Sequence, residues 1–214
     1  MEQLTRQLDI IPLAVLGEPI TIIGAGAIGS WTALSLAKMG FGNLQVIDFD
    51  TVTIENLSSQ FYRKQDIGKF KVDALKDLVH EFTGFSIQAN TEAYVNTKLN
   101  GTVICAVDSM KVRRAIFDAH QNVHPCFMID PRMGAEVLAL YTYRPFYPTE
   151  RTMYEKTLYT DENSVQEPCT RKATAYCASV LSGLVCAQVK AKVTNQRTTW
   201  QTQMDIPQMG FMKW

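Results

Sequence analysis

The chain has 214 residues, which is enough for one large domain whose core needs neither disulfides nor a structural metal. Its 21 basic and 21 acidic residues balance, so the composition gives no sign of nucleic acid or an acidic membrane surface as a partner. The five cysteines include no CxxC pair, no apolar run reaches transmembrane length, and the chain does not begin like a signal peptide, so we expect a soluble cytoplasmic protein.

The first part of the chain predicts one βαβ unit. An N-terminal arm of residues 1–19 precedes a buried strand over residues 20–23, which is apolar, β-branched and ends at a glycine. Residues 29–39 have the apolar spacing of a helix, with Gly40 as its C-terminal cap, and residues 44–47 predict the next strand.

The rest of the chain continues the alternation. Helices are predicted over residues 68–82 and 110–120, and strands over residues 85–89, 102–106, 126–129 and, antiparallel, 137–143. Residues 145–168 predict a long loop, residues 170–193 a long helix, and the remainder a tail with Trp200 and Trp214. Together these elements predict a single α/β domain over residues 20–214. It has a Rossmann-like, doubly wound, mostly parallel sheet with an antiparallel extension and a long C-terminal helix.

A GxGxxG motif links the first strand to its helix, with glycines at Gly24, Gly26 and Gly29. The first glycine permits a tight turn, the second lets a phosphate approach the backbone, and the third lets the helix pack against the strand. Phosphates then lie at the helix N-terminus, where free N–H groups favour negative charge. Asp48, at the end of the next strand, is placed to accept hydrogen bonds from ribose hydroxyls. Taken alone, the motif favours NAD, because dehydrogenases are its commonest owners.

The residues after the second strand change that interpretation. An acidic DFD at Asp48–Asp50 is followed by NLSSQ at Asn56–Gln60 and by GKFK at Gly68–Lys71. This series resembles the ThiF/MoeB/HesA adenylyltransferases and the adenylation domains of ubiquitin-activating enzymes, which show DxD, Asn-Leu-x-Arg-Gln and Gly-x-x-Lys before a helix. The resemblance covers residues 1 to about 140 well and the last third loosely.

The resemblance implies a role for five residues. Asp48 binds the ribose, Asn56 contacts the nucleotide near its phosphates, and Lys71 neutralises phosphate charge during adenylation. Asp108 holds the magnesium of Mg-ATP, and Arg6 reaches the ATP of the partner subunit in a homodimer. Such a set suits adenylation, which needs cations and Mg²⁺ around a triphosphate. Asp108 is also placed to cap the following helix.

The sequence departs from the family at one position. Where Asn-Leu-x-Arg-Gln has arginine, this chain has Ser59, which supplies no charge to a triphosphate. Arg63 is the nearest candidate to replace that arginine, with Lys69 behind it, although a surface arginine with no such role is an equal alternative.

Cys169 directly precedes the helix predicted over residues 170–193 and is followed by two cations. A thiol at a helix N-terminus beside cations has a depressed pKa, which makes Cys169 the best candidate nucleophile for a thioester or persulfide step. A cysteine that packs at the helix cap is the simpler alternative. Cys177 and Cys186 are expected in the core, and Arg132 either receives a carboxylate tail or forms a structural ion pair.

The sequence therefore predicts an enzyme that uses ATP and Mg²⁺ to adenylate the C-terminal carboxylate of a small ubiquitin-like or sulfur-carrier protein, or of a peptide. The resemblance implies a homodimer, and neither nucleic acid nor a membrane is expected as a partner. Two alternatives stay open. One is an NAD(P)-dependent oxidoreductase, and the other is a nucleotide-binding pseudoenzyme or scaffold, which Ser59 favours.

Overall fold

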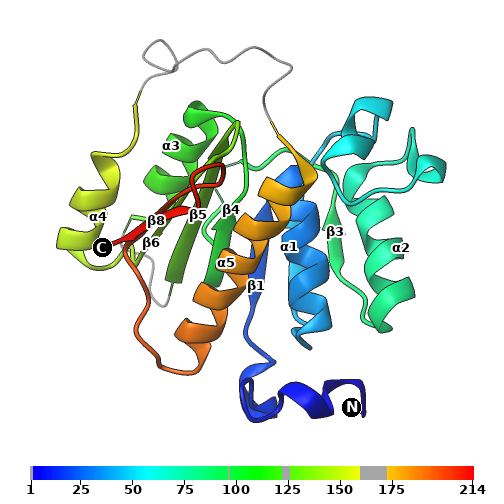
Figure 1. Cartoon of the computed structure of the whole chain (residues 1–214), viewed down its shortest axis with the longest axis horizontal. Coiled ribbons are helices and arrows are strands. Elements are labelled where there is room, and N and C mark those ends of the chain that lie inside the picture. Colours follow the sequence, from blue (N-terminus) through cyan, green and yellow to red (C-terminus); the bar gives the residue numbers. More distant parts are fainter. Residues whose placement is uncertain (1, 96, 122–125, 160–172) are drawn as a thin grey trace.

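The computed structural model describes residues 2–95, 97–121, 126–159 and 173–214, and these residues form one mixed sheet with helices on both faces (Figure 1). The strands are β1 (Ile20–Ile23), β2 (Leu44–Ile47), β3 (Gln88–Asn90), β4 (Gly101–Cys105), β5 (Cys126–Gly134), β6 (Val137–Tyr143), β7 (Gln201–Asp205) and β8 (Gly210–Lys213). The helices are α1 (Ala27–Lys38), α2 (Lys71–Thr83), α3 (Met110–Ala119), α4 (Pro148–Glu155) and α5 (Ala175–Val193). Short 3₁₀ turns are η1 (Glu2–Gln7), η2 (Leu13–Val15), η3 (Ile54–Ser58) and η4 (Lys64–Asp66).

The sheet has the strand order β3-β2-β1-β4-β5-β6-β7-β8. The first five strands pair in parallel, and β5 to β8 pair antiparallel. Neighbouring strand residues face opposite sides, so Ile22 packs in a core with α1, α2 and α5 while Ile23 packs in a second core with α3 and α4. The predicted doubly wound sheet with an antiparallel extension is therefore confirmed.

The strand that joins the two halves of the sheet is longer than predicted. Up to Ile129, β5 pairs with β4, and from Met128 to Gly134 it pairs with β6. The apolar run in the sequence ends at Asp130, so the pattern marked only residues 126–129. The antiparallel strand predicted at 137–143 is confirmed as β6.

Two predictions for the last third of the chain, a loop and the start of a helix, are corrected. The stretch 145–168, predicted as a loop, contains α4, which has Pro148 at its start and Glu150 in its first turn. The helix predicted over residues 170–193 begins only at Ala175, where the Thr174 hydroxyl accepts the Cys177 N–H as an N-cap. No described helix, α5 included, is long and apolar enough to cross a membrane.

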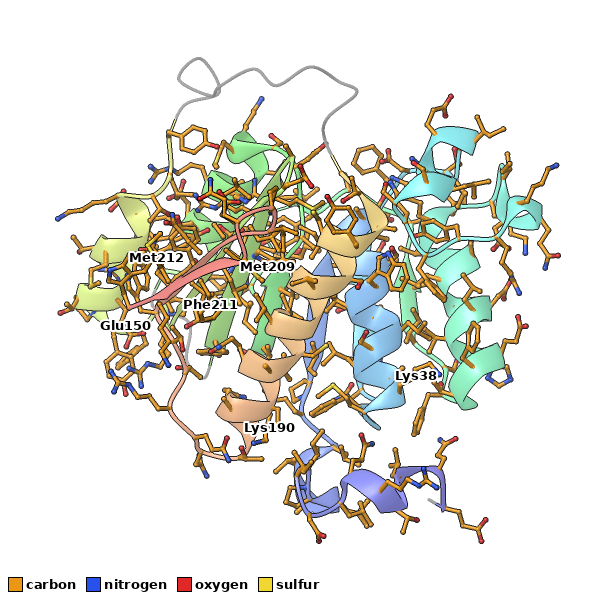
Figure 2. The ribbon with its side chains drawn as sticks, in the orientation of Figure 1. Lys38, Glu150, Lys190, Met209, Phe211 and Met212 are labelled. Atoms are coloured by element: carbon orange, nitrogen blue, oxygen red, sulfur yellow. The ribbon has the colours of Figure 1, made fainter. Side chains whose placement is uncertain are left out.

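The predicted tail instead forms the hairpin of β7 and β8 at the edge of the sheet. The side chains of Met209 in the turn and of Phe211 and Met212 in β8 are exposed (Figure 2), so β8 lacks the alternation of buried and polar positions that marks a half-buried strand. Trp200, just before β7, is half-buried and packs edge-on against Tyr141 of β6.

Candidate active site

The candidate site lies at the carboxyl ends of β1, β2 and β4. The chain leaves β1 for β2 on one side, while β4 pairs with β1 on the other side. The helix after β1 covers one face of the sheet and the helix after β4 covers the opposite face (Figure 1). The chain therefore adds strands first on one side of β1 and then on the other. In open α/β sheets, ligands bind in the crevice that opens at the point where the strand order reverses in this way.

The glycine turn between β1 and α1 forms the floor of this crevice. Gly24 has φ +99°, and a Cβ on it would lie 2.4 Å from the Ala106 carbonyl oxygen, so only glycine fits. A Cβ on Gly29 would lie 1.9 Å from the Gly24 carbonyl oxygen, which explains the third glycine. At Gly26 a Cβ would meet nothing within 4 Å, and no side chain caps the α1 N-terminus. Both the open space at Gly26 and the uncapped N–H groups suit a phosphate.

Two side chains fix the turn at Ala25. The Ala25 N–H donates to Asp48 Oδ2 at 2.6 Å, and the Tyr62 hydroxyl donates to the Ala25 carbonyl at 2.7 Å. Burial and then the negative charges of Asp48 and Asp66 raise the pKa of Tyr62 well above its ordinary value, so the hydroxyl keeps its proton. The sequence offered no signal for Tyr62, since the contact joins residues 37 positions apart.

Asp48 has a structural role that the sequence did not predict. Its second oxygen, Oδ1, accepts the N–H of Asp50 at 2.8 Å, so both carboxylate oxygens already hold backbone groups. Each oxygen keeps a further lone pair that is able to accept a ribose hydroxyl.

Lys71 lies beside this pair at the first residue of α2. Its Nζ donates to Asp50 Oδ2 at 2.7 Å, and its backbone N–H donates to the Asp50 carbonyl at 2.9 Å. Only 8% of the Lys71 side chain is exposed, whereas 52% of Asp50 is exposed. The ammonium group is therefore held in the loop after β2 by Asp50, and the Asp50 N–H in turn donates to Asp48, which accepts the Ala25 N–H of the glycine turn. Asp50 belongs to the DxD pattern, but the sequence alone assigned it no role, whereas the structure pairs it with Lys71.

Asn56 and Asp108 lie on the two loops that flank the turn. The Asn56 side-chain oxygen accepts the Thr53 N–H at 2.9 Å in a capping box of η3, which leaves its NH₂ group as the available donor. Asp108 is exposed in the loop after β4, and Ser109 rather than Asp108 caps α3 by accepting the Val112 N–H. No described residue pairs with the Asp108 carboxylate, so it is available to a ligand.

Magnesium in nucleotide sites is commonly held by one or two carboxylates together with phosphates, so a single Asp108 fits that ion. Among the described residues there is no group of three or more His, Cys, Asp or Glu side chains that would form an all-protein metal site.

The two candidate replacements for the arginine missing at Ser59, Arg63 and Lys69, are both held in ion pairs in this structure. Ser59 is buried, and its carbonyl accepts the Trp31 indole N–H at 3.0 Å. Arg63 forms ion pairs with Asp66 and with Glu81, which lies near the end of α2. Lys69 likewise pairs with Asp66, and also with Asp77. Using Arg63 or Lys69 on a phosphate would require breaking these ion pairs.

Arg6 lies on the arm at the opposite, amino-terminal edge of the sheet. Gln3 Nε2 donates to the Thr83 carbonyl at the end of α2, and Gln7 Nε2 donates to the carbonyl of Lys38 at the end of α1 (Figure 2). The 12 residues of α1, about 18 Å, separate these contacts from the glycine turn. Arg6 therefore does not reach the site of its own chain in this arrangement.

Cys169 lies outside the described residues, and α5 begins six residues after it, so the argument from a helix N-terminus does not hold for this helix. Cys105, Cys126, Cys177 and Cys186 are all buried, which confirms the core assignment of the last two. Burial raises the pKa of Cys105, Cys126 and Cys186 to about 12, so these three remain thiols at neutral pH and are poor nucleophiles.

The chain is similar to proteins of known type over part or all of its length. The model of the ThiF family matches residues 16–212. The NEDD8-activating enzyme E1 catalytic subunit of Drosophila melanogaster is 36% identical over 106 residues, covering 45% of this chain and 23% of the relative. Ubiquitin-like modifier-activating enzyme 5 of Caenorhabditis elegans is 30% identical over 115 residues, covering 45% of this chain and 27% of the relative. The matches thus span about a quarter of these relatives.

Solved structures resemble the whole chain. The crystal structure of PaaA covers 100% of this chain and 72% of its own, with a TM-score of 0.79 and 18% identity. The crystal structure of E. coli MccB with ATP covers 100% of this chain and 71% of its own, with a TM-score of 0.76 and 16% identity. At these identities the likeness shows the fold alone.

Proposed function

Because the chain belongs to the ThiF family, we propose that it uses ATP to adenylate a carboxylate and releases pyrophosphate. One observation carries the proposal. The α1 N-terminus is uncapped and open at Gly26, and it lies between a buried ammonium at Lys71 and a free carboxylate at Asp108. Anion-binding N–H groups flanked by a cation and a metal-binding carboxylate suit a magnesium-bound triphosphate better than they suit a dinucleotide.

In the proposed reaction, an oxygen of the acceptor carboxylate attacks the α-phosphorus of ATP. The bond to the β-phosphate oxygen breaks, and the products are an acyl adenylate and pyrophosphate. The uncapped N–H groups of α1 bind phosphate oxygens, Asp48 and Asn56 orient the nucleotide, and Lys71 supplies positive charge to the phosphates. A magnesium ion held by Asp108 would add further positive charge at the departing pyrophosphate.

The acceptor we propose is a small ubiquitin-like or sulfur-carrier protein, or a peptide, with a free C-terminal carboxylate. The support is the named relatives, which activate NEDD8 or another ubiquitin-like modifier, and the likeness to MccB, whose structure was also solved with MccA. Cys169 stays a proposed nucleophile for a later thioester or persulfide step. The test for it is mass spectrometry of the enzyme after incubation with ATP and acceptor, which detects a thioester, and after incubation with a sulfane-sulfur donor, which detects a persulfide. Absence of both adducts on Cys169 would remove it from the mechanism.

The function is tested by nucleotide binding and exchange. We expect calorimetry to show binding of Mg-ATP and little affinity for NAD, and we expect labelled pyrophosphate to exchange into ATP when candidate carboxylate tails are added. Binding of NAD without ATP would instead support the oxidoreductase. Binding of ATP with no exchange for any ubiquitin-like, sulfur-carrier or peptide tail would support a nucleotide-binding scaffold.

We further propose that the active unit is a symmetric homodimer in which Arg6 acts on the partner's ATP. Its support is that the arm holds Arg6 at the edge of the sheet away from its own glycine turn. Arginine suits this task because its guanidinium keeps its charge and donates two hydrogen bonds to phosphate oxygens.

We predict that mixing an inactive Arg6→Ala subunit with an inactive Lys71→Ala subunit restores exchange. Statistical mixing gives one intact site in each mixed dimer, so about one quarter of wild-type activity should return. The control is each variant mixed with itself. If mixed dimers form and no activity returns, Arg6 does not act across the interface.

A further inference from the structure

A buried ionic cluster that the proposed mechanism does not use lies beneath the Asp108 loop. Its members, which we call the Asp130 cluster, are Arg113, Asp130, Arg132 and Tyr154. Asp130 is 1% exposed, and its Oδ1 accepts Arg113 Nε at 2.9 Å. Its Oδ2 accepts Arg132 Nε at 2.7 Å and the Tyr154 hydroxyl at 2.8 Å.

The cluster is costly to bury and is therefore an unusual way to stabilise a core. Charges taken out of water lose hydration that their mutual attraction only partly restores, so apolar side chains of similar size often stabilise a core as well. Burial opposes the charged form of Arg113, yet the Asp130 carboxylate outweighs it and raises the pKa of the guanidinium above its ordinary value. Both arginines therefore stay charged, and their remaining N–H groups have fixed directions.

The Nη2 group of Arg113 contacts the loop after β4, which carries Asp108. Arg113 Nη2 donates to the Val107 carbonyl, which belongs to the peptide bond that leads directly into Asp108. The same nitrogen lies 3.5 Å from the Pro131 carbonyl oxygen. The loop also touches the glycine turn, since a Cβ on Gly24 would lie 3.3 Å from the Val107 backbone nitrogen. Arg113 and the glycine turn therefore both contact the peptide groups of Val107, which lead into Asp108.

Arg132 holds a different segment. Its Nη1 donates to the Thr157 carbonyl at 2.8 Å and its Nη2 to the Thr157 hydroxyl at 2.9 Å, just after α4. The structure thus resolves the alternative for Arg132 in favour of an ion pair. Since no bond joins Arg132 to residues 106–108, the two arginines share one carboxylate but only Arg113 reaches the site.

We infer that Arg113, oriented by Asp130, is a positioning residue that fixes the Val107–Asp108 peptide so that the Asp108 carboxylate meets the magnesium of Mg-ATP. The inference rests on the proposed function. A lysine at position 113 would keep the positive charge opposite Asp130 but lacks the planar fork that reaches both the carboxylate and the Val107 carbonyl.

The test compares Arg113→Lys with its matched control, Arg132→Lys, which makes the same change on the same carboxylate. Calorimetry measures the affinity for ATP with Mg²⁺ and with EDTA, and thermal unfolding measures stability. Losing a charge-assisted hydrogen bond that orients a ligand should weaken Mg-ATP binding about tenfold in Arg113→Lys. Binding in EDTA should hardly change, and Arg132→Lys should leave both affinities within about twofold although its melting temperature falls comparably.

A double-mutant cycle separates positioning through Asp108 from a general structural effect. In the Asp108→Asn background, Arg113→Lys should produce no further loss of magnesium-dependent affinity. An undiminished loss in that background, or equal losses in Arg113→Lys and Arg132→Lys, would overturn the inference. If Arg113→Lys does not fold, Asp130→Asn takes its place, because it keeps the shape of the cluster and removes the charge that orients Arg113. Its magnesium-dependent loss should match the tenfold effect, and an unchanged affinity would overturn the inference.

Failure of the inference and failure of the proposed function remain distinguishable. If wild-type protein binds no ATP with or without Mg²⁺, the proposed function fails before any variant is compared. If wild-type protein binds Mg-ATP and Arg113→Lys binds it equally well, only the positioning role of Arg113 is wrong.

Discussion

Replacing Lys71 by alanine should lower the rate of ATP–pyrophosphate exchange at least about 10²-fold while the protein stays folded. A fixed cation aimed at phosphate charge is worth a few kcal/mol in a preorganised site, because it needs no reorientation during the reaction. The Lys71 ammonium meets this condition, since its side chain is almost fully buried and its Nζ is held by Asp50 in the loop after β2.

The fold should tolerate the change because the partner left behind is exposed. With 52% of its side chain accessible, Asp50 is hydrated when Lys71 is absent, so no unpaired buried charge results. Lys71→Met is the sharper variant, since it keeps the buried aliphatic stem and removes only the charge. It should lose as much exchange activity as Lys71→Ala and lose less stability.

The matched control is Lys76→Ala, which removes an exposed lysine from the same helix. Exchange should stay within about twofold of wild type in this control, as expected for a solvated surface charge. Nearly unaltered exchange in Lys71→Met, with folding verified by circular dichroism, would show that Lys71 has no role in adenylation.

The fold was predictable where the sequence carries local, periodic signals. The glycines at Gly24, Gly26 and Gly29 follow a β-branched run and open an apolar helix, so the spacing alone predicts the turn and the crevice above it. The start of α5 was not predictable in this way. The helix begins where Thr174 caps it, and nothing in the sequence before Thr174 argued against an earlier start at residue 170.

The contacts that hold the candidate site join residues far apart in the chain, which no local pattern reveals. Tyr62 reaches the Ala25 carbonyl across 37 positions, and Lys71 reaches Asp50 across 21 positions. Arg113 sits on an amphipathic helix where an arginine normally faces water, so its burial against Asp130 has no sequence signature. The ion pairs of Arg63 with Asp66 and Glu81 were likewise not readable from the sequence, and the role of Arg63 in place of the arginine missing at Ser59 stays a prediction.

Replacing Asp108 by asparagine should lower exchange by about 10²- to 10³-fold and shift its dependence on Mg²⁺ to higher concentrations. The physical reason is that asparagine keeps the shape of the side chain but offers a neutral oxygen, which magnesium binds more weakly than a carboxylate. Residues 106–109 of this loop contain no second carboxylate, so no neighbour on the loop replaces the lost negative charge.

The stability of the protein should not change with Asp108→Asn, and this separates a metal-binding role from a structural one. Asp108 is exposed, no described residue pairs with its carboxylate, and the N-cap of α3 is supplied by Ser109. Asp118→Asn is the matched control, since it neutralises an exposed carboxylate near the other end of the same helix. It should leave both the exchange rate and the magnesium dependence unchanged.

The measurement is exchange rate against Mg²⁺ concentration at saturating ATP, together with thermal unfolding. A melting temperature that falls by several degrees in Asp108→Asn, with magnesium dependence like that of wild type, would mean that Asp108 supports its loop and does not bind the metal.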